Sequence, residues 1–196
     1  MKVVLVQPPV EDFYDTDVRL QPIGLCYMKA AVKKWLPDID VVVRDYHAGF
    51  GRRTVAVPRA LRYLEAYYPV ADRSPFSTFH RYYHFGASFD DIEADLAALN
   101  PDLVAISSLF TPYYREALEV ACRAKRRLGV PVVAGGSHAS AVPESLLESP
   151  SVDYVIRGEG EKAFVEFLRF FNGEKPIEAV PNLAYKTDSR YALNPL

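Results

Sequence analysis

The sequence predicts a doubly wound α/β fold, in which helices cover both faces of a parallel β-sheet. Short runs of β-branched apolar residues recur along the chain without alternating polar residues, as expected for strands buried on both faces. Helical patterns separate these runs, and alternating strands and helices indicate parallel strands joined by right-handed crossovers. The chain has 196 residues, 49% of them hydrophobic, which is enough for one domain with a single core and an insertion.

Five apolar runs are the predicted strands, and four periodic segments are the predicted helices. The strands are expected at residues 2–7, 39–44, 103–107, 131–134 and 152–156, with a further extended piece at 183–186. The helices are expected at residues 23–36, 88–99, 113–128 and 161–171. Their ends carry the usual signals, because Pro22 precedes the first helix, Ser88 is the expected N-cap of the second and Gly129 follows the third.

A segment at residues 46–87 interrupts this rhythm, since it is far longer than an ordinary crossover and has no strand signal. The spacing of Val57, Leu61, Leu64 and Tyr68 predicts an amphipathic helix within a helical, aromatic-rich insert. Arginine and aromatic residues interleave along the insert. That pattern can stack nucleobases, but it is more often found in protein interfaces.

Composition narrows the class of protein. The 23 Lys and Arg residues nearly balance the 25 Asp and Glu residues, which argues against a general binder of nucleic acid or membrane surfaces. Cys26 and Cys122 are far apart, without metal-ligand spacing, and two cysteines do not suggest a secreted disulfide scaffold. The apolar run after Met1 is too short for a signal peptide or a membrane span, so a cytoplasmic location is expected.

The carboxyl ends of the predicted strands are the expected binding edge, because ligands of open doubly wound sheets bind there. Gly135 and Gly136 follow the fourth strand and would let a bulky ligand approach the backbone, while Ser137 and His138 supply hydrogen-bonding groups. A plain strand-to-helix turn is the alternative for these four residues.

Two other strand ends carry candidate binding groups. Gly158, Glu159 and Gly160 follow the fifth strand, where ligand contact and capping of the next helix are equally favoured. The third strand ends in hydroxyl-bearing residues that flank an apolar pair suited to a flat apolar ligand face: Ser107, Ser108, Leu109, Phe110 and Thr111. The first loop, residues 8–21, is long and acidic, and is either a solvated loop or a mobile lid.

The residues indicate a binder with no catalytic group or metal site of its own. His80 and His84 have the i, i+4 spacing of helical metal ligands, but no third ligand accompanies them. No Ser-His-Asp or Cys-His arrangement can be placed. Residues 6–9 (VQPP) replace the G-x-G-x-x-G that a dinucleotide-binding fold carries after its first strand, so a dehydrogenase is not expected.

Five segments, in order along the chain, resemble cobalamin-binding radical S-adenosylmethionine enzymes, and together they cover nearly everything except the insert. They are 4–9 (VLVQPP), 22–28 (PIGLCYM), 100–108 (NPDLVAISS), 131–138 (PVVAGGSH) and 153–161 (DYVIRGEGE). The resemblance implies a flavodoxin-like, Rossmann-type sheet of strand order 2-1-3-4-5, with the corrin over its carboxyl edge.

The same resemblance implies how the cofactor is held. The nucleotide tail would descend near Gly135, Gly136 and His138, with Ser107 and Ser108 beside it, while Pro8 and Pro9 belong to the same edge. Cobalamin would be bound with its own base displaced and no protein histidine on cobalt, with Leu109 and Phe110 below the corrin. The Asp45-Tyr46-His47 triplet resembles a cobalt-ligating Asp-x-His, but it follows the second strand instead of the first, and a structural histidine is favoured.

The resemblance also implies a missing partner. Radical chemistry needs a C-x-x-x-C-x-x-C cluster motif, and this chain has only two distant cysteines. Residues 1–181 are therefore expected to be the cobalamin-binding domain, and 182–196 the hairpin and linker toward a radical S-adenosylmethionine domain that holds S-adenosylmethionine and a [4Fe-4S] cluster. The whole enzyme would be a methyltransferase. A stand-alone cobalamin carrier, an interaction domain without cobalamin, and a flavin- or nucleotide-binding domain remain alternatives.

Overall fold

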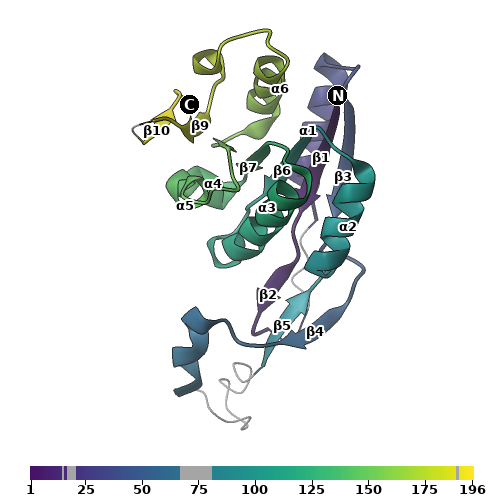
Figure 1. Ribbon diagram of the computed structural model, residues 1–196, viewed down its shortest axis with the longest axis vertical. Helices are drawn as coiled ribbons and strands as arrows, with labels where there is room; N and C mark the ends of the chain where they lie inside the picture. The colour runs from purple at the N-terminus through teal and green to yellow at the C-terminus, as the bar shows by residue number, and fades with distance from the viewer. Residues whose placement is uncertain (15, 17–20, 67–80, 189) are drawn as a thin grey trace.

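The computed structural model describes residues 1–14, 16, 21–66, 81–188 and 190–196. Within them, a seven-stranded sheet of order β10-β9-β8-β7-β6-β1-β3 forms the centre of the fold (Figure 1). Its strands are β1 (Lys2–Gln7), β3 (Asp40–Asp45), β6 (Leu103–Ser107), β7 (Val132–Gly135), β8 (Tyr154–Ile156), β9 (Leu183–Lys186) and β10 (Tyr191–Leu193).

Five adjacent strands of this sheet are parallel, in the order β3, β1, β6, β7 and β8, which confirms the doubly wound α/β fold. Strands β9 and β10 extend the sheet as an antiparallel hairpin beside β8, so the sheet has two strands more than predicted. These last strands belong to residues 182–196. Leu183 and Ala184 are fully buried, and the Asn194 amide donates to the carbonyls of Ile177 and Val180, both at 2.8 Å.

Helices cover both faces of the sheet. They are α1 (Ile23–Trp35), α2 (Phe89–Leu99), α3 (Tyr114–Leu128), α4 (Ser137–Ala141), α5 (Pro143–Leu147) and α6 (Gly160–Phe171). Helices α1, α2, α3 and α6 lie within one residue of the predicted bounds, whereas the short helices α4 and α5 were not predicted. No helix in the described ranges is long and apolar enough to cross a membrane.

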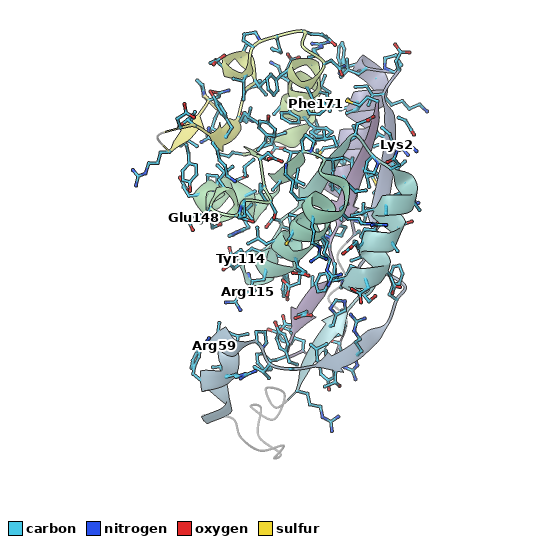
Figure 2. The ribbon with its side chains drawn as sticks, in the orientation of Figure 1. Lys2, Arg59, Tyr114, Arg115, Glu148 and Phe171 are labelled. Carbon is cyan, nitrogen blue, oxygen red and sulfur yellow. The ribbon has the colours of Figure 1, made fainter. Side chains whose placement is uncertain are left out.

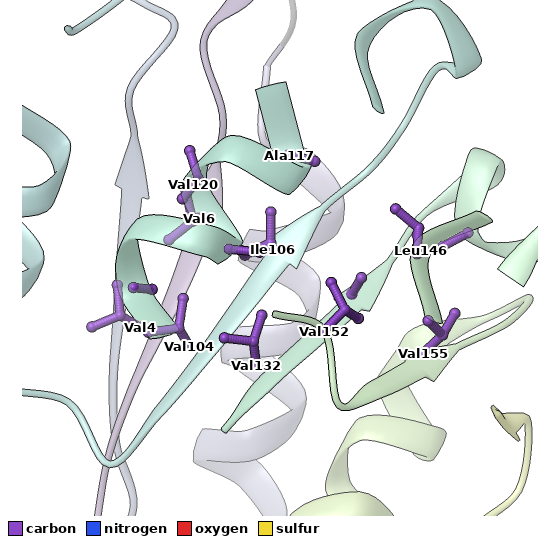
Figure 3. Close-up of a cluster of buried hydrophobic side chains, with 14 of the residues drawn as sticks. Val4, Val6, Val104, Ile106, Ala117, Val120, Val132, Leu146, Val152 and Val155 are labelled. Atoms are coloured by element: carbon purple, nitrogen blue, oxygen red, sulfur yellow. The ribbon is translucent and has the colours of Figure 1, made fainter. Parts of the chain in front are cut away.

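The two faces of the sheet have separate cores. Val4, Val104 and Val132 from adjacent strands pack with Val120 of α3 on one face (Figure 3). On the other face, the apolar side chains of β1, β6 and β7 pack against α1 and α6. This alternation, with apolar residues pointing both ways from each strand, is why the runs in the sequence are continuous.

The insert at residues 46–87 is not the helical segment that the sequence predicts. It contains β4 (Arg52–Val55), the 3₁₀ helix η1 (Arg59–Ala66) and β5 (Tyr82–Phe85), while residues 67–80, including Tyr68, lie outside the described residues. β5 pairs antiparallel with both β4 and β2 (Val10–Asp12) and forms a small sheet of order β2-β5-β4. Three- and four-residue strands are stabilised here by pairing with a distant segment, which no local pattern reveals. In Figure 1 the small sheet lies beyond the carboxyl end of β1.

Candidate functional site

A cavity of about 600 Å³ opens at the carboxyl edge of the main sheet. Its walls come from β6, β7 and β8 on one side and from α1 and α6 on the other. The volume lies within the range of small-molecule sites, about 300–1,000 Å³. The lining residues at the opening are Gln7, Gln21, Pro22, Gly24, Ser107, Leu109, Gly135, Gly136, Ser137, Ser140, Ala141, Ile156, Gly158, Glu159, Gly160 and Glu161, and those further in are Leu25, Met28, Ala105, Ile106, Val133, Ala134 and Phe164.

The strand register gives the depth of the cavity. Ser107 pairs with Gly135 at the carboxyl ends of β6 and β7, and Ala105 pairs with Val133 two residues further inside. Two residues of strand correspond to about 6.6 Å. The cavity therefore continues from the carboxyl edge into the space between the sheet and the helices α1 and α6.

The two glycines after β7 have different structural roles. Gly135 carries no side chain on the cavity wall, and an added Cβ would meet only the Ile156 carbonyl oxygen, at 3.6 Å. At Gly136, with φ +113°, a Cβ would lie 2.6 Å from the Ser108 carbonyl oxygen. Only glycine fits at 136, because the ends of β6 and β7 approach closely there. The Ser108 N–H donates to the Gly135 carbonyl at 2.7 Å.

The loop before α6 completes the opening and is tied to the loop after β7. Gly158 N–H donates to Ser140 Oγ at 2.7 Å, and the same hydroxyl donates to the Gly136 carbonyl at 2.8 Å. Glu159 occupies the N-cap position of α6 but makes no side-chain cap hydrogen bond. Gly158, Glu159 and Gly160 all lie on the cavity wall.

His138 and Ser108 do not line the cavity, in contrast to what the sequence suggests. The His138 ring is buried, with Nδ1 3.1 Å from Thr111 Oγ1 and Nε2 3.0 Å from Ser145 Oγ, and burial lowers its pKa. It packs against the Tyr114 ring with centroids 5.2 Å apart. Ser108 is 2% exposed, and its hydroxyl has no hydrogen-bond partner among the described residues. His138 therefore connects the residues after β6 to α5 by hydrogen bonds and does not contact the cavity.

Beside the cavity, Pro8 and Pro9 face the residues that follow β6. A small hollow of about 10 Å³ lies among Pro8, Pro9, Leu109 and Phe110, next to Tyr113. Phe110 is 45% exposed, and its ring meets Tyr113 edge-on with centroids 6.3 Å apart. The structure thus brings together the apolar residues predicted for the edge, and Leu109 borders both the cavity and this hollow.

A buried polar junction joins the small sheet to α3, and no sequence pattern indicates it. His84 is 1% exposed, with Nδ1 2.9 Å from Glu11 Oε1 and Nε2 2.7 Å from the Ala87 carbonyl. Because a backbone carbonyl can only accept, Nε2 of His84 donates to the Ala87 carbonyl. Figure 2 labels Tyr114 and Arg115 at the start of α3, and the residue before them, Tyr113, reaches the small sheet by donating its hydroxyl to Asp12 Oδ2.

Glu116 of α3 belongs to the same junction. It is 4% exposed, and its Oε2 has no hydrogen-bond partner in the described part of the chain. Burial, with a smaller contribution from the nearby Glu11 carboxylate, raises the pKa of the Glu116 carboxyl to about 7, against the opposite effect of backbone N–H groups at 116 and 11 and of the Arg115 guanidinium. Glu116 therefore titrates closer to neutral pH than an exposed glutamate.

The remaining histidines offer no metal centre in the described ranges. His47 is 2% exposed in the turn after β3, where its backbone N–H donates to Asp45 Oδ1 at 2.9 Å. His84 lies in a strand and not on a helix, and His80 lies outside the described residues. Among the residues that the structure describes, no group of three His, Cys, Asp or Glu residues is placed to hold a metal ion.

The family model described as B12 binding domain matches residues 51–168. The chain is 27% identical over 197 residues to cytidylyl-2-hydroxyethylphosphonate methyltransferase of Streptomyces wedmorensis, covering 99% of this chain and 33% of that protein. It is 33% identical over 199 residues to an uncharacterized methyltransferase of Pyrococcus horikoshii, covering 100% and 35%. The chain thus spans about a third of the length of these relatives.

Solved structures show the same fold. The radical S-adenosylmethionine methyltransferase TsrM from Kitasatospora setae, with cobalamin and a [4Fe-4S] cluster bound, superimposes with a TM-score of 0.62 at 20% identity, over 99% of this chain and 28% of that one. The cobalamin-dependent S-adenosylmethionine radical enzyme OxsB, with aqua-cobalamin and S-adenosylmethionine bound, gives a TM-score of 0.66 at 16% identity, over 99% and 22%.

Proposed function

This chain belongs to the B12-binding domain family, and from that premise we propose that it holds cobalamin as one module of a larger radical S-adenosylmethionine methyltransferase. The observation that carries the proposal is the cavity at the carboxyl edge, whose polar opening leads to an apolar interior. Ligands of doubly wound sheets bind at this edge.

The residues present fit cobalamin. Gly135 leaves the cavity wall bare at the edge, where the nucleotide tail would enter. Ser107 and Ser137 at the opening offer hydroxyl groups to the polar part of the tail, and Glu159 and the backbone around Gly158 and Gly160 face it from α6. When bound, cobalamin supplies a cobalt centre that can carry a methyl group.

The apolar edge beside the cavity suits the corrin. Phe110 is exposed and Leu109 is half-buried, while Pro8 and Pro9 are buried and border the same small hollow. Exposed apolar side chains beside a cavity with a polar opening are typical of a ligand site. We assign Leu109 and Phe110 to the underside of the macrocycle, with Pro8 and Pro9 packed behind them.

Cobalt is expected to receive no protein imidazole and to be bound with its own base displaced. Of the described histidines, His84 and His138 bond to other groups through both ring nitrogens, and His47 is buried in the turn after β3. Electron paramagnetic resonance of bound cob(II)alamin should therefore show cobalt hyperfine lines without splitting by a coordinating nitrogen. Nitrogen splitting that disappears in His47→Ala would identify His47 as the ligand and contradict this assignment.

Titration of the chain with hydroxocobalamin tests the proposal directly. Cobalamin is expected to co-elute with the protein in gel filtration, with the visible spectrum of the base-displaced form. Co-elution of a flavin or nucleotide instead would favour a different ligand class on the same fold. A chain that binds neither would favour the interaction-domain alternative.

The catalytic step is assigned to the rest of the polypeptide. The curated relatives are about three times as long as this chain, and its two cysteines cannot form a C-x-x-x-C-x-x-C motif. We assign S-adenosylmethionine and the [4Fe-4S] cluster to a radical S-adenosylmethionine domain of the same polypeptide, with residues 182–196 leading toward it. The reaction would be a methyl transfer, as the names of the relatives indicate.

A further inference from the structure

The inner end of the cavity is apolar on every side. Ala105 and Val133, paired on β6 and β7, form the sheet wall, and both are at most 4% exposed. Leu25 and Met28 of α1 line the same cavity, Met28 with its sulfur next to Gly160, and Phe164 of α6, which is fully buried, lines it from the other helix.

The polar lining groups all lie at the opening. They belong to strand ends, loops or first helical turns, as their positions show: Gln7, Gln21, Ser107, Ser137, Ser140, Glu159 and Glu161. The backbone groups of the inner wall are also engaged, because β6 is paired on both sides, with β1 and β7, and β7 with β6 and β8. A group that reaches the inner end therefore meets carbon and one thioether sulfur.

Corrinoids differ in the base at the end of the nucleotide tail. A dimethylbenzimidazole presents a carbocyclic edge with two methyl groups, whereas adenine presents ring nitrogens and an exocyclic amine. A buried polar group without a partner costs free energy that an apolar group of similar shape does not. The two bases are of similar size, so the chemistry of their edges decides between them.

We propose that this inner end selects corrinoids by their lower base, accepting benzimidazole-type bases and disfavouring purines. The inference rests on the proposed cobalamin function and adds a specificity to it. Leu25, Met28, Val133 and Phe164 are the residues that determine this specificity. They act by offering no hydrogen-bond partner to a purine edge.

The test compares the dissociation constants of cobalamin, adeninylcobamide and cobinamide, which lacks the nucleotide. Each constant is corrected for the base-displaced fraction of the free corrinoid, measured from its own visible spectrum. Cobalamin is expected to bind at least about tenfold more tightly than adeninylcobamide, and more tightly than cobinamide.

The outcomes separate the two proposals. If cobalamin and adeninylcobamide bind equally, base selection is wrong while corrinoid binding stands. If cobinamide binds as tightly as cobalamin, the nucleotide does not use the cavity, and base selection is again overturned. If none of the three binds, the proposed function itself fails.

A pair of matched variants locates the selectivity. Val133→Thr places a hydroxyl on the cavity side of β7, and Val132→Thr places the same hydroxyl on the opposite face, in the core with α3. Both side chains are at most 2% exposed, so each variant buries one hydroxyl and should lose a similar amount of folding stability. Val133→Thr should reduce the cobalamin preference several-fold, and Val132→Thr should preserve it. An equal change in both variants would overturn the assignment.

Discussion

Gly135→Val is expected to weaken cobalamin binding by about 5- to 150-fold while the domain stays folded. The added methyl groups would occupy the cavity wall at the edge, where the tail must pass, since a Cβ at 135 faces only the Ile156 carbonyl at 3.6 Å. Overpacking by one or two methyl groups costs roughly 1–3 kcal/mol, which corresponds to that range of dissociation constants. Spectroscopic titration of purified protein measures the effect.

Gly135→Ala is the graded control, because it adds one carbon in place of three and should weaken binding less. Thermal unfolding checks the fold, and the melting temperature of Gly135→Val is expected to equal or exceed that of the wild type, since valine favours strands and glycine does not. Unchanged affinity in a folded Gly135→Val protein would remove Gly135 from the site. Gly136 offers no such test, since any side chain there meets the Ser108 carbonyl.

Glu116→Gln is expected to make the domain more stable above pH 7 by up to about 3 kcal/mol. The pKa of Glu116 is raised from its ordinary 4.5 to about 7, mainly by burial. The folded state therefore binds this proton more tightly than the unfolded state. Its contribution to stability is present below about pH 4.5, falls between about pH 4.5 and 7, and is lost above pH 7. Each pKa unit is worth about 1.4 kcal/mol.

The measurement is the free energy of unfolding, by urea denaturation, of wild type and Glu116→Gln at several pH values. The difference between the two proteins should grow from pH 4.5 to 7 and then level off, since glutamine resembles the protonated acid and does not titrate. Parallel curves for the two proteins across that range would show that burial does not shift Glu116. A carbon-13 titration of the Glu116 carboxyl in the folded protein gives the pKa independently.

The main sheet could be predicted because its signals are local. The continuous runs at 2–7 and 103–107 coincide with β1 and β6, and Ser88 caps α2 by accepting from the Asp91 N–H at 3.1 Å. The small sheet could not be predicted, since β2 and β5 are short and are paired across more than seventy residues of chain. The sequence of β5, YYHF, does not alternate, because all four residues are buried.

The candidate site was predictable only at the strand ends. Gly135 and Ser107 line the cavity; a glycine pair followed by polar residues at a strand end is more than a turn needs. Gly158 also lines it, at a strand end where the sequence left ligand contact and helix capping open. Leu25, Met28 and Phe164 could not be predicted as cavity residues. An apolar residue on the inner face of a helix gives the same sequence pattern whether it packs against a neighbour or borders a cavity. His138 does not line the cavity, because its buried ring bonds to the Thr111 and Ser145 hydroxyls, and the sequence does not show such tertiary partners.

The position of β1 in the centre of the sheet has a consequence for synthesis on the ribosome. Val3 pairs with Val41 on one side and with Leu103 on the other, so one edge of β1 stays open until β6 has been made. The residues between β3 and β6, which include the insert, must be synthesised first. At about 5–20 residues per second this takes roughly 3–12 seconds. The small sheet, complete by Phe85, can form within this interval. An apolar strand with a free edge is a template for aggregation, so the nascent chain is most exposed to aggregation while the core is unfinished, at a stage when the small sheet can already have formed.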